Sequence, residues 1–201
     1  MNNNTLRIGT RKSRLAMVQT EIVREEMLAH FPFLEVEIVP MSTKGDQILD
    51  RSLTSFGGKG VCTKELEEAL LRGEIDLAVH SAKDMPMELA AGLSIVGVPR
   101  REDPRDVLVT AAGRPVPETG EIVIGTSSPR RKLQIELLGT DLWPGGSVRC
   151  ENLRGNVQTR LGKLESGMYH GIILAAAGLK RLGQLEDPHY NFQFLECESF
   201  I

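Results

Sequence analysis

The sequence predicts an α/β fold in which strands and helices alternate along the chain. Residues 6–10 have the pattern of a short strand, and Ser13 then begins a stretch in which apolar side chains recur at helical spacing. A similar order returns at residues 121–126, which are followed by a helix pattern that begins at Ser128. Residues 75–79 are a largely apolar run of the length typical of a buried strand. This alternation favours mostly parallel sheets flanked by helices.

The composition is that of an ordinary globular protein, and it excludes several functional classes. The 201 residues are 41% hydrophobic and 25% charged, with a formal net charge of -3, so we expect neither nucleic acid nor a membrane surface as a partner. Residues 1–5 lack the apolar core of a signal peptide, and no segment approaches the length of a membrane span. The three cysteines, Cys62, Cys150 and Cys197, are too scattered for a disulfide framework or a metal site. We therefore expect a cytoplasmic protein with reduced thiols.

A change in composition near residue 100 divides the chain. Residues 100–106 are dense in charge, and residues 111–120 are rich in proline and glycine. Domain boundaries often fall in such segments. We expect domain 1 at residues 1–99 and domain 2 at residues 100–201.

The first half of the chain supplies the elements before the apolar run. Ser13 can cap a helix that ends at Pro32, and apolar and acidic residues alternate over residues 34–38 as in a strand. Residues 64–72 predict a second helix, which Gly73 ends. Because the start of a helix favours anions, Arg11 and Ser13 lie where an anionic ligand would bind.

Residues 56–60, Phe-Gly-Gly-Lys-Gly, form a flexible loop whose spacing is not that of a Walker motif. The loop is either a mobile lid that carries Lys59 or a plain surface loop.

A polar cluster follows the apolar run, and it is the strongest candidate for chemistry. His80, Ser81, Lys83 and Asp84 come directly after residues 75–79. In α/β proteins the carboxyl ends of strands are where ligands bind. Asp84 could hold a cation or move a proton there. The alternative is that Asp84 caps the next turn and Lys83 is solvated.

The second half repeats the strand–helix order. Ser128 and Pro129 have the cap and first-residue chemistry of a helix start, yet two arginines follow in the first turn, against the helix dipole. A carboxylate ligand would explain this violation, and the alternative is that both arginines point into solvent. Further strands are expected at residues 147–150 and 171–176, and further helices after Asn156 and at residues 178–181.

Five arginines are expected at or near these strand-to-helix junctions: Arg130, Arg131, Arg154, Arg160 and Arg181. Such junctions lie on one rim of a parallel sheet. Because Arg pairs with carboxylates and phosphates through two parallel hydrogen bonds, the rim suits a ligand with several such groups. The arginines could instead only add solubility.

Seven motifs cover nearly the whole chain: IGTRKS (8–13), GGKG (57–60), AVHSAKDMP (78–86), REDPRD (101–106), GTSS (125–128) with RR (130–131), LRGN (153–156) with TRL (159–161), and AGLKR (177–181). In these motifs and in their order, the chain resembles the porphobilinogen deaminase family, also called hydroxymethylbilane synthase.

The resemblance implies two domains like those of type II periplasmic binding proteins, an active cleft between them, and a third, smaller domain. It implies a dipyrromethane cofactor tied by a thioether to a cysteine of that third domain. The family reaction condenses four porphobilinogen molecules head to tail, loses ammonia each time, and releases hydroxymethylbilane for haem synthesis. The implied partners are porphobilinogen and the growing polypyrrole, and the full-length protein is expected to be a monomer.

The resemblance also assigns roles to residues. Asp84 would be the catalytic carboxylate, assisting ammonia loss and stabilising cationic pyrrole intermediates, and Lys59 would lie on the lid. Carboxylates of the cofactor would be held by Lys83, Ser128, Arg130 and Arg131. The incoming substrate would be held by Arg11, Ser13, Arg154 and Arg160, with Arg181 nearby. No metal is implied.

The chain also departs from the family pattern. The third domain and its cofactor cysteine are expected to be absent, and Cys197 lies too early to replace that cysteine. Cys62 stands where the family usually has an aromatic residue, and we interpret it as a packing substitution and not as an alternative attachment point. Pro129 replaces a usually aliphatic residue and is harmless at a helix start. We therefore expect these 201 residues to show little or no turnover. The alternative function is a non-catalytic small-anion binding module of the periplasmic-binding-protein type.

Overall fold

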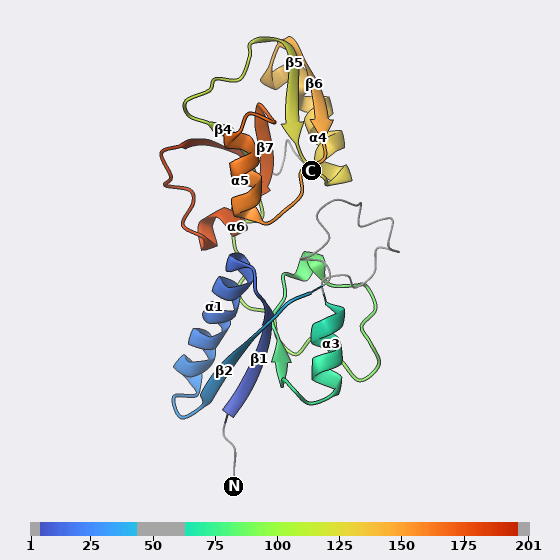
Figure 1. The fold of residues 1–201 in the computed structure, drawn as a ribbon, viewed down its shortest axis with the longest axis vertical. Coiled ribbons are helices and arrows are strands. Elements are labelled where there is room, and N and C mark those ends of the chain that lie inside the picture. The colour runs from blue at the N-terminus through green and yellow to red at the C-terminus, as the bar shows by residue number, and fades with distance from the viewer. Residues whose placement is uncertain (1–4, 44–62, 197–201) are drawn as a thin grey trace. The chain divides into compact units, whose positions relative to one another are not determined.

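The computed structural model describes residues 5–43 and 63–196, and the chain divides into two compact units, Met1–Arg100 and Arg101–Ile201 (Figure 1). Each unit combines a β-sheet with helices, so the predicted α/β class is confirmed. The Lys59 loop and two of the three cysteines, Cys62 and Cys197, lie outside the described residues.

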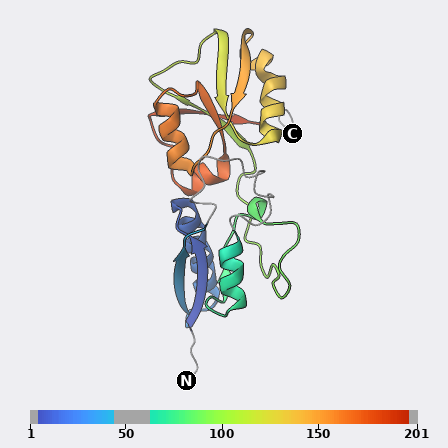
Figure 2. The ribbon, with the colours of Figure 1, turned by 45° about the vertical axis from the view of Figure 1, so that its right-hand side comes forward.

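The described part of the first unit holds a parallel three-stranded sheet in the order β2-β1-β3. Its strands are Thr5–Arg11 (β1), Glu35–Met41 (β2) and Leu77–Ala78 (β3). Its helices are Arg14–His30 (α1), Lys64–Leu71 (α3) and the short 3-10 helix Ala82–Asp84 (η2). Figures 1 and 2 show α1 beside β1 and β2, and α3 beside β3.

Local sequence signals explain where the helices of the first unit begin and end. The Ser13 hydroxyl accepts a hydrogen bond from the Ala16 backbone N–H at 3.3 Å and so caps α1. Gly73, at a φ of 68°, ends the α3 region, and the N–H of Glu74 reaches back to the Ala69 carbonyl at 2.9 Å. Both helix ends are therefore where the sequence predicts them.

A glycine allows α3 and β3 to pack closely on β1. A Cβ at Gly9 would lie 2.3 Å from the Ile75 side chain and 2.8 Å from that of Leu66. Ile75 and Leu66 are 2% and 0% exposed, and with Ala69 they form the small core of this unit. The absence of a side chain at Gly9 thus leaves room for Leu66 of α3 and for Ile75, which precedes β3, to pack against β1.

The strand after Gly73 is shorter than the sequence predicts. Residues 75–79 were expected to form a buried strand, but β3 itself is Leu77–Ala78 and is only half-buried. Hydrogen bonds to β1 extend a little further, from the Asp76 N–H to Arg7 and from the Val79 N–H to Gly9. In the described sheet, β3 pairs only with β1, and this position at the edge accounts for its partial exposure.

The second unit has a five-stranded mixed sheet in the order β6-β5-β7-β4-β8. Its strands are Asp106–Ala111 (β4), Thr119–Gly125 (β5), Gly145–Glu151 (β6), Gly171–Ala175 (β7) and Tyr190–Leu195 (β8). Its helices are Pro129–Leu142 (α4), Val157–Glu165 (α5) and Ala176–Arg181 (α6). β5 runs parallel to β6 and β7, whereas β4 is antiparallel to β7 and β8.

The sequence did not predict β4 and β8. The residues before β4 are densely charged, and we interpreted that segment only as a domain boundary. β4 is nevertheless buried from Asp106 to Val109, because β7 and β8 cover its two edges. Pairing between segments this far apart in the sequence leaves little local signal.

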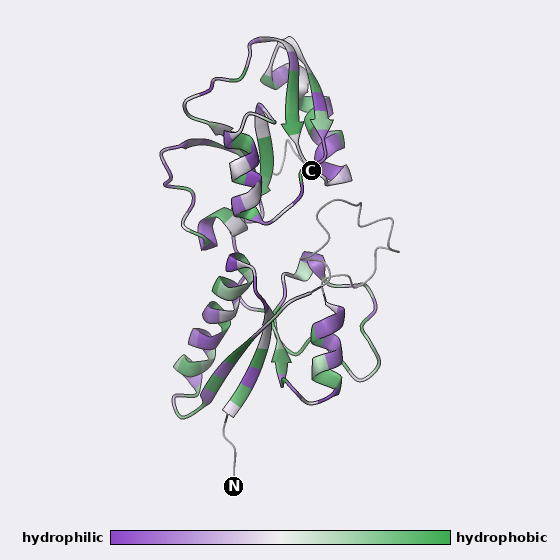
Figure 3. Ribbon diagram, viewed as in Figure 1, coloured by the Kyte–Doolittle hydropathy of each residue, from purple (hydrophilic) through white to green (hydrophobic). Residues whose placement is uncertain are grey.

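Helices cover both faces of this sheet. Side chains on β4 and β7 alternate, so that Val107 and Ile172 join the core under α5 and α6, while Leu108 and Ile173 join the core under α4. Figure 2 shows α4 on one side of the sheet and α5 on the other. Figure 3 shows that β5 and β7 are mostly hydrophobic, as expected for strands buried on both faces.

The topology of the parallel strands fixes where the polar loops lie. β5, β6 and β7 are parallel and lead into α4, α5 and α6, respectively. The three connections therefore leave the sheet at the same edge, which is where the arginine-rich segments were expected.

An exposed apolar segment in the first unit predicts self-association. Ile95, Val96 and Val98 are 63%, 77% and 80% exposed, and β3 leaves one edge unpaired among the described strands. We expect concentration-dependent association in sedimentation velocity, and Val96→Lys should reduce it. Ser94→Lys is the matched control, because it adds the same charge in the same segment without removing an apolar side chain. A wild-type chain that sediments as a monomer at every concentration would contradict this prediction.

Candidate functional site

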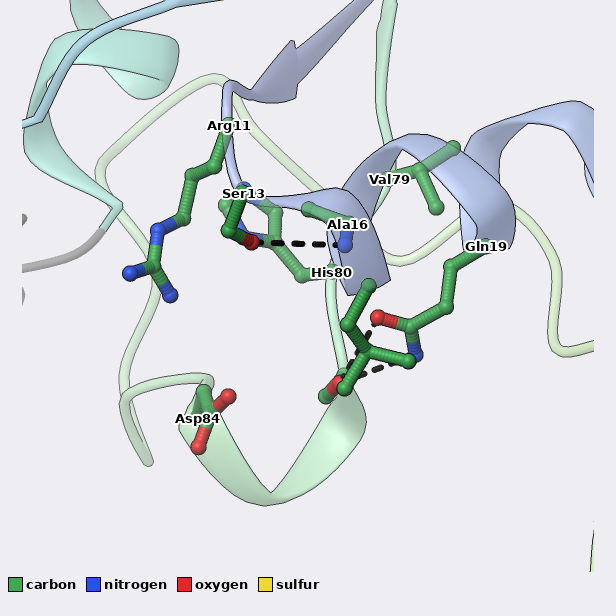
Figure 4. A pocket seen from close by; sticks show the side chains of 9 residues that line it. Arg11, Ser13, Ala16, Gln19, Val79, His80 and Asp84 are labelled. Atoms are coloured by element: carbon green, nitrogen blue, oxygen red, sulfur yellow. Dashed lines mark hydrogen bonds between the residues drawn. The ribbon is translucent and has the colours of Figure 1, made fainter. Parts of the chain in front are cut away.

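A pocket in the first unit gathers several residues that the sequence analysis selected. It forms where the end of β1, the first turns of α1 and the segment after β3 meet (Figure 4). Its lining is Arg11, Ser13, Leu15, Ala16, Gln19, Val79, His80, Ser81 and Asp84. Two predicted substrate-binding residues and the predicted catalytic carboxylate therefore lie in one place.

The pocket carries charges of both signs. The Arg11 guanidinium and the Asp84 carboxylate point toward the same space in Figure 4. The pocket also includes the start of α1, whose first N–H groups and dipole favour an anion. The arrangement suits a ligand that has a carboxylate at one end and a positive charge at the other.

Asp84 is available to such a ligand. It is exposed and lies in η2, whose turn is closed by a hydrogen bond from the Asp84 N–H to the Ser81 carbonyl at 2.9 Å. Within residues 5–43 and 63–196, the Asp84 carboxylate accepts no hydrogen bond and forms no ion pair. This geometry disfavours the alternative in which the Asp84 side chain serves as a cap. Lys83 is exposed in the same turn but does not line the pocket.

His80 is a pocket residue to which the sequence analysis gave no separate role. Burial lowers its pKa from the usual value of 6.5, and the Arg11 charge lowers the pKa further, whereas Asp84 and Glu67 oppose both effects. The imidazole is therefore mainly neutral at pH 7 and leaves the charge pattern of the pocket to Arg11 and Asp84.

In the second unit a buried carboxylate holds the two adjacent arginines of α4. Asp106, whose side chain is 5% exposed, accepts a hydrogen bond from Arg130 at 2.7 Å and one from Arg131 at 2.5 Å. Arg130 also donates to the Gln134 side chain, and Arg131 donates to the Ile173 carbonyl. The sequence analysis did not select Asp106, although an aspartate between a charged run and an apolar strand could have been noticed.

This pair explains the unfavourable charges at the start of α4. The alternative in which both arginines point into solvent is wrong for Arg131, whose side chain is only 11% exposed. The carboxylate that offsets the helix dipole belongs to the protein itself, at Asp106. Two guanidinium groups against one carboxylate leave one excess positive charge.

The arginine pair retains the capacity to hold a ligand carboxylate. The Arg130 side chain is 51% exposed, and the buried Nε of Arg131 has no hydrogen-bond partner among the described residues. The Ser128 hydroxyl accepts a hydrogen bond from the Arg131 backbone N–H at 3.4 Å, so its own proton can still be donated. These donors fit a carboxylate group.

The remaining predicted arginines lie on or beside α5 and α6. Arg154 lies between β6 and α5, and Arg160 lies in α5 itself. Arg160 Nε donates at 2.8 Å to the carbonyl of Gly155, whose φ is 113°. Arg181 is the last residue of α6, so it lies at the far end of that helix and not at the junction before it. Arg154 and Arg160 thus lie beside and within the start of α5, whereas Arg181 lies at the end of α6.

Comparison with known proteins identifies the family. Residues 6–201 match the family model described as porphobilinogen deaminase, dipyrromethane cofactor-binding domain. The chain belongs to the porphobilinogen deaminase family. Dipyrromethane, the cofactor expected from the sequence, is the one that this family domain binds.

Two curated relatives support this assignment. The porphobilinogen deaminase of Acetivibrio thermocellus is 50% identical over 179 residues, which cover 89% of this chain and 59% of the relative. That of Xanthomonas campestris pv. campestris is 51% identical over 182 residues, covering 89% of this chain and 57% of the relative. The chain therefore spans less than two thirds of the length of these relatives.

A solved structure shares the fold. CbnR, a LysR family transcriptional regulator, aligns with a TM-score of 0.53 at 15% identity, covering 96% of this chain and 58% of the CbnR chain. At this identity the likeness concerns the fold alone.

None of the described helices is long and apolar enough to cross a membrane, and the described residues contain no cluster of His, Cys, Asp or Glu suited to a metal ion.

Asp106 should be the most sensitive position in the second unit. Asp106→Asn keeps the size of the side chain but leaves two arginines without their carboxylate, so we expect a loss of about 3–5 kcal/mol in the free energy of unfolding. Urea denaturation followed by circular dichroism measures it. Glu121→Gln, which breaks the exposed Glu121–Arg149 pair, is the matched control and should change little. Equal losses in the two variants would contradict a special role for Asp106.

Cys150 should be a poor nucleophile. Burial raises the pKa of its thiol to about 11, helped by the Glu136 charge. We expect iodoacetamide at pH 8 to modify Cys150 in the folded chain about a hundredfold more slowly than in the urea-unfolded chain, because the thiolate is scarce. Mass spectrometry of the Cys150 peptide measures both rates. Similar rates in the two states would contradict the expected suppression of Cys150 reactivity.

Proposed function

We propose that this chain carries the porphobilinogen-binding and catalytic carboxylate groups of a hydroxymethylbilane synthase. That enzyme condenses four porphobilinogen molecules into hydroxymethylbilane with loss of ammonia. The observation that carries the proposal is the Asp84 carboxylate, open to a ligand in a pocket that also contains Arg11 and the start of α1. Identity of 50% to a porphobilinogen deaminase supports it.

The chemistry of porphobilinogen matches this pocket. The molecule carries an acetate, a propionate and a positively charged aminomethyl group on a pyrrole ring. Arg11, Ser13 and the start of α1 would bind a carboxylate, while Asp84 would face the aminomethyl group. As ammonia leaves, positive charge spreads over the pyrrole, and a fixed carboxylate stabilises that charge. Asp84 would thus favour the transition state over the bound substrate.

The arginines of the second unit would hold the other carboxylates. We assign Arg130 and Arg131, with Ser128 and Lys83, to the carboxylates of the dipyrromethane cofactor, and Arg154, Arg160 and Arg181 to those of the substrate. When bound, the cofactor supplies the pyrrole carbon from which the polypyrrole grows. The excess positive charge beside Asp106 supports this division of roles. The role of Lys59 on a lid remains a prediction.

We further propose that these 201 residues alone bind porphobilinogen but complete few catalytic cycles. The chain spans 59% of the length of a curated relative, and the pKa of Cys150, the free cysteine in the described part, is raised to about 11. A cytoplasmic location, a monomeric full-length form and the absence of a nucleic-acid partner belong to the same proposal.

The experiment that tests the function compares two ligands in two variants. Porphobilinogen and glutarate, a dicarboxylate without an amine, are titrated into the chain by calorimetry. Asp84→Asn should weaken porphobilinogen binding at least about tenfold, because a charged hydrogen bond is lost, and should leave glutarate binding unchanged. Glu88→Gln, an exposed acid nearby, is the matched control and should change neither. If the chain is instead a small-anion binding module, Asp84→Asn, like Glu88→Gln, should leave the affinity for each ligand unchanged.

The intact mass of the chain, before and after incubation with porphobilinogen, tests its own activity. A mass equal to that of the bare sequence, without release of ammonia, is the expected result. A gain of two pyrrole units would show that a cysteine of this chain attaches the cofactor, and the low-turnover proposal would then be wrong.

A further inference from the structure

A contact between two polar side chains joins α1 to the segment that carries Asp84. The Gln19 amide donates a hydrogen bond to the Ser81 hydroxyl at 2.9 Å, and that hydroxyl lies 3.2 Å from the Gln19 carbonyl oxygen, to which it can donate. Both residues line the pocket, and dashed lines in Figure 4 mark the bonds made by Gln19. The contact spans 62 positions of sequence, so it is a tertiary link.

Among the described residues, the backbone hydrogen bonds that join the segment after β3 to β1 stop before η2. Its last described hydrogen bond to β1 runs from the Val79 N–H to the Gly9 carbonyl at 3.1 Å. Beyond it, η2 is closed by bonds within the turn, from Asp84 to Ser81 and from Met85 to Ala82. Those local bonds shape the turn, but they do not fix its place relative to α1.

Gln19 is well placed to supply that position. It lies in the second turn of a 17-residue helix whose start is capped by Ser13, so its backbone is held firmly. Because Ser81 is the residue before η2, fixing its hydroxyl fixes the origin of the turn. Asp84 then follows three residues later, on the side of the pocket opposite Arg11.

We propose that Gln19 is a positioning residue whose amide holds Ser81, and through it the turn that bears Asp84, against α1 so that the Asp84 carboxylate faces Arg11 across the pocket. The positioning role of Gln19 is inferred from its hydrogen bonds with Ser81. Only the consequence for porphobilinogen rests on the function proposed above.

His80 provides a readout of the turn that needs no ligand. Burial keeps its pKa low, Arg11 acts in the same direction, and Asp84 and Glu67 act in the opposite one. If the turn moves away from α1, the ring gains solvent and its pKa should rise toward 6.5, since burial is the largest of these effects. NMR titration of the ring protons, assigned with His80→Gln, follows this change in the full chain.

A matched set of variants tests whether the Gln19–Ser81 contact controls the His80 pKa. Gln19→Ala and Ser81→Ala should each raise the His80 pKa, and the double variant should raise it no further, because both remove one contact. Ser81→Thr keeps the hydroxyl and should preserve the wild-type pKa. Glu25→Ala, on an exposed position of the same helix, is the control and should also preserve it. An unchanged His80 pKa in both Gln19→Ala and Ser81→Ala would overturn the proposal.

Ligand binding separates positioning from a merely structural role. Gln19→Ala should weaken porphobilinogen binding about threefold to tenfold while leaving glutarate binding unchanged, because Arg11 and the start of α1 do not depend on the turn. Equal weakening of both ligands would indicate general damage to the pocket and would count against positioning. If the wild-type chain does not bind porphobilinogen, the proposed function fails, and the His80 titration still decides the role of Gln19.

Discussion

Parallel pairing of β1 with β3 is the constraint on which the first unit depends. It aligns Gly9 with Ala78, so the residues that follow each strand leave the sheet at the same edge. Arg11 and Asp84, more than seventy positions apart, thereby line one pocket. The missing side chain at Gly9 leaves room for Ile75, just before β3, because a Cβ there would lie 2.3 Å from the end of the Ile75 side chain. A backbone requirement in the core thus determines where the charged groups meet.

Local rules were enough to predict much of the fold. Ser13, Ser128 and Asn156 each cap the helix that the sequence placed after them, because capping involves residues only three positions apart. The strands β4 and β8 were missed, since their stability comes from pairing with each other and with β7. The short β3 was overestimated for the same reason, because an apolar run alone does not show how many neighbours a strand will have.

Some residues of the candidate site could be selected from the sequence, whereas others depend on contacts that only the fold creates. Residues beside strand ends and helix starts, such as Arg11 and Asp84, could be selected from position alone. Asp106 could not, because its importance comes from Arg130 and Arg131, which the fold brings to it from another element. The unfavourable arginines at the start of α4 did signal a carboxylate, but no local pattern indicated that the protein itself supplies one at Asp106. The contact between Gln19 and Ser81 was hidden for the same reason.

The charge imbalance around Asp106 has a consequence for the conditions under which a ligand would be held. The guanidinium groups of Arg130 and Arg131 are weakly hydrated cations, so the excess positive charge of this cluster can pair with a carboxylate at a modest cost in lost hydration. Arg130 is half exposed, and mobile ions can therefore screen it, whereas Arg131 is largely shielded from them. Retention of carboxylates at this cluster should consequently weaken as ionic strength rises, and the share held by Arg130 should weaken most.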